Sequence, residues 1–153
     1  MIEIEHLFMS PGHNYFGHHA KPAANHLMLR VPTVDCVAGR GIAGDRFFDH
    51  KPDYNGQITL FATEVFEQLC AELGLADADA GALRRNVVTR GMELNRFIGR
   101  EFTLQGVRFV GTEECRPCYW MNSSLRNPTA ETWLKGRGGL RAKILSSGPL
   151  QCG

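Results

Sequence analysis

The chain has 153 residues, is 43% hydrophobic, and carries 17 basic and 16 acidic side chains for a net charge of +1. This length suits one domain that buries a core without disulfides or a structural metal. The charge balance gives no global basic field for nucleic acid, and no apolar run approaches the ~18 residues of a membrane span. The N-terminus lacks the basic segment of a secretory signal. We therefore expect a single cytoplasmic domain over residues 1–153 that binds neither nucleic acid nor membrane.

The first half of the chain alternates strands with long turns. Partial alternation predicts a strand over residues 2–9, and a loop rich in histidine and proline follows over 10–32. A strand is expected over 33–39, and a glycine-punctuated turn follows it. The short apolar segment 56–62 is typical of a further strand.

A helix is predicted over residues 63–75, because apolar side chains recur there at helical spacing. Thr63 is the expected N-cap, and Gly74 is the expected stop. Residues 77–85 have the composition of a short helix or turn, and 86–90 that of a strand.

The second half is expected to contain a hairpin, two helices and a last strand. Segments 101–104 and 107–112 form the hairpin, because Gln105-Gly106 between them suits a two-residue turn. Helices are predicted over 119–125 and 128–136, and a strand over 138–148. Six or seven strands and two or three helices that do not alternate regularly indicate an α+β fold, mostly β and barrel-like.

Cys115 and Cys118 form a Cys-x-x-Cys motif at the expected start of a helix. A helix N-terminus lowers a thiol pKa, and the thiolate is the nucleophile and metal ligand. The motif does not follow the first strand of a βαβ unit, and no second cysteine or histidine pair of zinc spacing is near it. Two interpretations stay open, a functional thiol beside Arg116 or two buried cysteines. Five cysteines without regular spacing indicate reduced thiols.

Two further segments carry candidate ligand-binding side chains. In LRRNVVTRG, Arg84 and Arg85 offer forked donors suited to phosphate, and Asn86 offers a donor and an acceptor. In GRGIAGDRFF, Asp45 and Arg46 form either an internal salt bridge or a ligand clamp, without a dinucleotide or phosphate-loop pattern. The alternative for both segments is an ordinary structural or solvated charge pair.

The loop over residues 10–32 holds His13, His18, His19 and His26. Such a density of histidine is typical of metal sites, but the spacings of 5, 1 and 7 fit no helical zinc pattern. A place at the rim of a pocket is the alternative for these side chains.

Taken together and in order, five segments resemble the MOSC domain family, named after the C-terminal domain of molybdenum cofactor sulfurases. The resemblance extends over about residues 33–147. The segments are GDRFF (44–48), GQITLFA (56–62), RRNVVTRGMELNRFIGREF (84–102), GTEECRPCYWM (111–121) and GRGGLRAKIL (136–145).

The resemblance implies a β-barrel-like fold that binds the molybdenum cofactor, a molybdenum held by the dithiolene of a pterin that carries a phosphate. The family's functional cysteine matches Cys118, the implied molybdenum ligand, with Cys115 as a second catalytic candidate. The implied contacts with the cofactor are Asp45, Arg46, Gln57, Thr59, Arg84, Asn86 and Arg116, with Arg85 as the alternative to Arg84 if the register of the match differs by one residue. Members of the better-known reductase group often have histidine and glycine where Phe47 and Phe48 stand here.

Three functions follow as hypotheses. The first is a reductase that acts on N-hydroxylated or related small molecules with Cys118 as molybdenum ligand, and with electrons from a separate donor protein. The second is a carrier of persulfide sulfur or of the cofactor to an acceptor, which is not itself a catalyst. The third is a metal-binding or redox module that uses Cys115, Cys118 and the loop histidines without a pterin.

Overall fold

The computed structural model describes residues 2–11, 28–75, 78–117 and 120–153. In these ranges it has ten strands, three α-helices and two 3₁₀ turns. The strands are β1 (Glu3–Met9), β2 (Leu29–Val31), β3 (Thr33–Val37), β4 (Gly41–Ile42), β5 (Ile58–Ala62), β6 (Val87–Arg90), β7 (Glu101–Leu104), β8 (Val107–Glu114), β9 (Leu140–Ile144) and β10 (Gly148–Gln151). The helical elements are α1 (Thr63–Leu73), η1 (Ala80–Leu83), η2 (Leu94–Phe97), α2 (Trp120–Ser124) and α3 (Ala130–Leu134).

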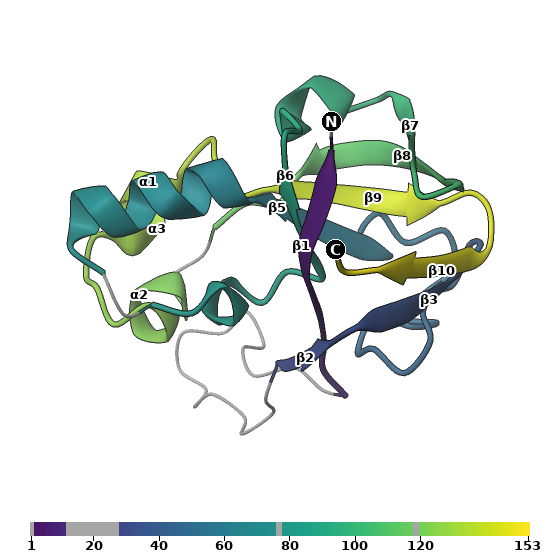
Figure 1. The fold of residues 1–153 in the computed structure, drawn as a ribbon, viewed down its shortest axis with the longest axis horizontal. Helices are drawn as coiled ribbons and strands as arrows, with labels where there is room; N and C mark the ends of the chain where they lie inside the picture. The colour runs from purple at the N-terminus through teal and green to yellow at the C-terminus, as the bar shows by residue number, and fades with distance from the viewer. Residues whose placement is uncertain (1, 12–27, 76–77, 118–119) are drawn as a thin grey trace.

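The strands form two sheets that enclose the main core. The larger sheet has the order β2-β1-β6-β5-β9-β8-β7, and the smaller one has the order β10-β3-β4. The pair β5–β6 is parallel, and the other pairs are antiparallel. The architecture confirms a mostly-β α+β fold with few helices (Figure 1). Within the described residues no pairing closes either sheet into a barrel, so barrel closure stays a prediction.

Strand β5 is central because both of its faces are covered. Its five side chains are all buried, as a sequence that is apolar except for Thr59 suggests. Leu60 packs in the core between the sheets, and Phe61 points to the opposite side, where the helices lie. The predicted hairpin is confirmed between β7 and β8, with Gln105 and Gly106 at φ of 51° and 83°. Positive φ at both residues matches the twist of the flanking strands.

The helices gather at one side of the larger sheet (Figure 1). Leu69 of α1 packs there with Phe61, Met121 and Leu134 in a second core. Helix α1 ends at Gly74, which adopts the left-handed conformation as predicted. In the described part of the chain, no helix has the length and apolarity to cross a membrane.

Three predictions about the elements need correction. Thr63 is not the N-cap of α1, because Ala62 occupies that position and the Thr63 hydroxyl donates to Glu5 Oε2 instead. The predicted loop over 10–32 contains β2, which pairs with β1. The predicted strand over 138–148 is two strands. Strand β9 ends at Ile144. The Leu145 N–H then donates to the Arg108 carbonyl, and β10 pairs with β3 in the smaller sheet.

The contact between Glu5 and α1 predicts a pH-dependent stability. The Thr63 hydroxyl at 2.6 Å, and then Arg90 at 2.7 Å, lower the pKa of Glu5 below its usual value of 4.5. Because the pKa of Glu5 is lower in the folded state than in the unfolded state, the charged carboxylate stabilises the fold fully above about pH 5. This stabilisation is lost as the pH falls through the lowered folded-state pKa. Glu5→Gln should therefore be less stable than wild type at pH 7 by about 3 °C in Tm. The difference should narrow in melts at acidic pH.

Glu3→Gln is the matched control, because Glu3 is exposed on the same strand. Its melting temperature should follow that of wild type at every pH. A Glu5→Gln deficit that stays constant down to pH 3 would contradict the assignment.

Two glycines predict losses of stability of different size for the same substitution. A Cβ on Gly138 would stand 2.0 Å from the Cys115 carbonyl oxygen, which is backbone and cannot move alone. A Cβ on Gly56 would meet only the flexible guanidinium of Arg141, at 2.7 Å. Gly138→Ala should lower the free energy of unfolding by about 2–4 kcal/mol, and Gly56→Ala by less than about 1 kcal/mol. Urea titration of both variants measures the contrast, and equal losses would refute it.

Candidate functional site

A cavity of about 470 Å³ lies where the end of η1, the end of β8 and the loop before β5 meet. It brings together residues that are far apart in the sequence. Six of the predicted site residues line it: Arg46, Thr59, Arg84, Arg85, Cys115 and Arg116. Arg141, Glu113 and Glu114 also line it, so its described wall has five arginines and two glutamates. Since Arg141 pairs with Glu113, the remaining described wall has four arginines and one glutamate.

Arg46 is a buried arginine that the adjacent turn holds in place. Its side chain is 5% exposed, and it donates to Asp45 Oδ1 at 3.1 Å and to the Arg84 carbonyl at 2.8 Å. Asp45 in turn accepts from the Ser10 N–H at 3.0 Å, which ties the turn to the end of β1. Burial lowers the pKa of Arg46, so the position disfavours its positive charge. Asp45 and Arg46 are therefore an internal salt bridge at the cavity wall.

Arg85 is the second buried arginine, with the whole residue 7% exposed. Its Nε donates to the Gly138 carbonyl at 3.0 Å, and its Nη1 donates to the Leu83 carbonyl at 2.8 Å. Among the described residues no carboxylate forms an ion pair with it. A buried charge is costly unless it is paired, and carbonyl dipoles offset only part of that cost. An anion in the cavity would supply the missing counter-charge.

Arg84 and Arg85 both reach the cavity because the backbone turns sharply at Arg84. Arg84 has a φ of 56°, in the left-handed region, directly after η1. The turn begins at Asp79, whose Oδ1 accepts from the Gly81 N–H at 2.7 Å. The sequence left open which of the two arginines faces a ligand, and the structure places both in the wall.

Three predicted residues lie beside the cavity rather than in its described wall. Asn86 is fully buried, and its side chain accepts from the Thr59 N–H at 3.0 Å and donates to the Phe8 carbonyl at 3.2 Å. Gln57 accepts from the Ile144 N–H at 2.9 Å, and Asp45 holds Arg46. These side chains position the wall, and their contact with a ligand stays a prediction.

Cys115 lines the cavity, and its N–H donates to the Gly139 carbonyl at 2.8 Å. Cys118 and the four loop histidines His13, His18, His19 and His26 lie outside the described residues. The described residues contain no group of three or more histidine, cysteine or acidic side chains placed to hold a metal. Cys36 lies in the core, where burial raises the pKa of its thiol to about 12.

The sequence analysis missed an aromatic and charged group at the same cavity. The rings of Phe47 and Tyr54 lie 5.6 Å apart, and the Arg141 guanidinium lies 5.1 Å from the Tyr54 ring. Gly56 lets Arg141 approach, because any side chain there would collide with the guanidinium. Strand alternation around Leu140 and Ala142, both fully buried, was the signal that could have shown Arg141 facing away from the core.

Comparison with known proteins agrees with this architecture. The solved structure of YuaD from Bacillus subtilis is similar with a TM-score of 0.77 and 18% identity, over 100% of this chain and 93% of that one. YiiM from Geobacillus stearothermophilus is similar with a TM-score of 0.70 and 14% identity, over 100% of this chain and 72% of that one. YiiM from Escherichia coli is similar with a TM-score of 0.65 and 16% identity, over 93% of this chain and 65% of that one.

At such identities the structural similarities establish the fold alone. No curated protein matches the sequence. The sequence model of the MOSC domain, however, matches residues 13–153, which is nearly the whole chain and includes every residue of the cavity wall. The chain therefore belongs to the MOSC domain family, a family associated with binding of the molybdenum cofactor.

Proposed function

We propose that this MOSC protein binds the molybdenum cofactor in the arginine-rich cavity, with the phosphate of the cofactor beside Arg46, Arg84 and Arg85. The observation that carries the proposal is the guanidinium of Arg85, which is buried in the wall without a carboxylate partner among the described residues. Arginine forks match phosphate oxygens, and charge-assisted bonds to them are strong in a water-poor site.

The rest of the wall fits a pterin with a sulfur-bound metal. Tyr54 and Phe47 offer aromatic surface next to the arginines, which suits a planar heterocycle. Cys115 stands in the wall, and Cys118 follows it three positions later in the chain. We propose Cys118 as the protein ligand of molybdenum, because a soft thiolate suits a metal whose other ligands are dithiolene sulfurs.

The proposed activity is reduction of N-hydroxylated or related small molecules. The bound cofactor would supply two-electron redox chemistry at molybdenum. Conversion of an N–OH group to N–H consumes two electrons and two protons and releases water. We propose that the electrons come from a separate electron-donor protein. The arginines would orient the bound group, and Glu114 in the cavity wall is the side chain we propose to exchange a proton with the substrate.

The second candidate is a carrier of sulfur, and the position of Cys115 favours it. In this role Cys118 would hold sulfane sulfur as a persulfide for transfer to an acceptor. Attack of the Cys115 thiolate on the inner sulfur would then form a Cys115–Cys118 disulfide and release hydrosulfide. Both candidates require reduced thiols, and for that reason we propose a cytoplasmic location.

The anion site can be tested without the cofactor. Inorganic phosphate should raise the melting temperature of the purified protein, because a ligand that binds only the folded state stabilises it. Arg85→Met should weaken phosphate binding by about tenfold or more, and Arg85→Lys should restore part of it. Isothermal titration calorimetry measures both affinities. Arg100→Gln is the control, because Arg100 is exposed and outside the described cavity wall. Equal phosphate affinity in wild type and Arg85→Met would overturn the site.

The metal assignment requires protein from a host that makes the cofactor. Wild type should copurify with molybdenum and a fluorescent pterin, and Cys118→Ser should lose about tenfold or more of the molybdenum, because a hydroxyl is a poor replacement for a thiolate. Cys152→Ser, which changes a cysteine outside the described cavity wall, should retain the wild-type content.

The same preparations separate the alternatives. Cyanide-releasable sulfur without molybdenum, lost in Cys118→Ser, supports the carrier. Stoichiometric zinc and no pterin would reject both candidates in favour of a metal module. If Cys118→Ser retains wild-type molybdenum and releasable sulfur, Cys118 has neither role.

A further inference from the structure

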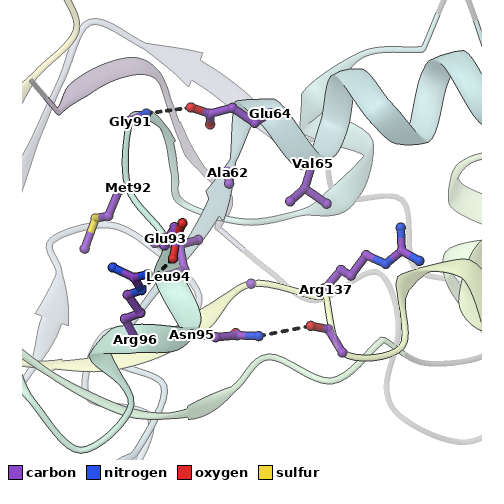
Figure 2. Close-up of a pocket in the computed structure, with 12 residues that line it drawn as sticks. Ala62, Glu64, Val65, Gly91, Met92, Glu93, Leu94, Asn95, Arg96 and Arg137 are labelled. Carbon is purple, nitrogen blue, oxygen red and sulfur yellow. Dashed lines mark hydrogen bonds and ion pairs between the residues drawn. The ribbon is translucent and has the colours of Figure 1, made fainter.

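A second and larger cavity, of about 650 Å³, lies elsewhere in the described part of the chain. Its walls come from the junction of β5 and α1, from η2 with the loop before it, and from the loop over residues 136–139 (Figure 2). It shares no described lining residue with the arginine-rich cavity. Its volume falls within the range of ordinary small-molecule sites.

The surface of this cavity is apolar at its floor and charged at its rim. Ala62, Met92 and Leu94 are buried, and Val65 of α1 is partly buried beside them. Figure 2 shows Met92 and Arg96 on one side of the opening and Val65 and Arg137 on the other. An apolar floor with a few polar groups is typical of sites that take a small organic ligand.

The charges at the rim are not equally available to a ligand. Glu64 Oε2 accepts from the Gly91 N–H at 2.7 Å, and Glu93 Oε2 pairs with Arg96 Nε at 2.6 Å. Both carboxylates therefore already have donors. The Arg137 guanidinium lies 4.1 Å from the Trp133 ring, and no carboxylate among the described residues forms an ion pair with it. Of the described rim arginines, Arg137 thus lacks a carboxylate partner and lies next to an apolar floor.

We propose that this cavity binds a small amphipathic organic anion, with an apolar body over Val65, Met92 and Leu94 and one carboxylate or sulfonate at Arg137. The stacked Trp133 ring holds the guanidinium at the rim, which reduces the conformational entropy lost on binding. The proposal does not depend on the molybdenum cofactor, because it uses other residues.

Two dyes with the same aromatic body test the chemistry separately. Anilinonaphthalene sulfonate carries one sulfonate, and phenylnaphthylamine is its neutral analogue. Both should bind the natively folded protein saturably with a rise in fluorescence. Val65→Phe should weaken binding of both, because the added ring occupies the cavity. Arg137→Gln should weaken the sulfonate about fivefold and leave the neutral dye within about twofold, as expected for one partly exposed charge contact.

Controls distinguish effects on each cavity from effects on folding. Circular dichroism and melting temperature establish that each variant is folded. Arg100→Gln removes an exposed arginine outside both described cavity walls and should leave both dyes unaffected. Both dyes are titrated in saturating inorganic phosphate, which occupies the arginine-rich cavity, so failure of the phosphate site and failure of this site are distinguishable. Dye binding in phosphate that survives Val65→Phe would overturn the proposal, and so would equal losses of both dyes in Arg137→Gln.

Discussion

The buried charge of Arg85 is the constraint on which the site depends. A guanidinium removed from water needs acceptors, and the fold supplies two backbone carbonyls, those of Leu83 and Gly138. Carbonyl dipoles satisfy N–H groups but do not neutralise the charge. Arg46 differs from Arg85 because the carboxylate of Asp45 neutralises its charge. Burial nevertheless lowers the pKa of Arg46. Within the described residues, the wall therefore combines Arg46, which Asp45 neutralises, with Arg85, which has no carboxylate partner and which a bound anion would neutralise.

The fold keeps these arginines in place through a local left-handed turn that is anchored to the larger sheet. Asn86 connects the edge of the cavity to the sheet, because its side chain bonds to Thr59 on β5 and to Phe8 on β1. Directly before it, the left-handed turn at Arg84 directs two consecutive side chains into one space. A fully buried asparagine with satisfied bonds tolerates little displacement, because an unmade bond there costs the full desolvation of the group. The position of the arginines thus follows from the pairing of β1, β5 and β6.

The sequence predicted the fold class well, because strand patterns and the Gln105-Gly106 turn are local signals. The predictions were wrong at element boundaries that are set by tertiary contacts. Thr63 has the composition of an N-cap, yet its hydroxyl is used by Glu5 from another strand. The break between β9 and β10 also depends on Arg108, which is distant in the chain.

The candidate site was predictable only in part, because tertiary contacts decide which side chains face the cavity. Motif resemblance identified six of the residues in the wall, but it could not distinguish residues that line the cavity from residues that position the wall. Asn86 and Gln57 have the polarity of ligand-binding residues and serve backbone groups in the structure. Tyr54 and Arg141 were missed, since only the folded chain brings the loop before β5 against β9. The larger cavity is lined mostly by residues of segments that carry the family resemblance, yet none of its lining residues was predicted as a site residue.

The loop over residues 136–139 shows why the two cavities are separate and yet adjoin the same segment. A Cβ on Gly138 would stand 2.0 Å from the Cys115 carbonyl, and one on Gly139 would stand 2.2 Å from the Leu60 carbonyl. Backbone therefore packs on backbone on both sides of this segment. Its Gly138 carbonyl accepts from Arg85 in one cavity, while Gly136, Arg137 and Gly139 line the other. Because a segment packed so closely cannot move far without disturbing Cys115 and Leu60, we expect it to act as a rigid partition. Ligands in the two cavities should accordingly bind with little mutual influence, since coupling between sites requires an element with two accessible arrangements.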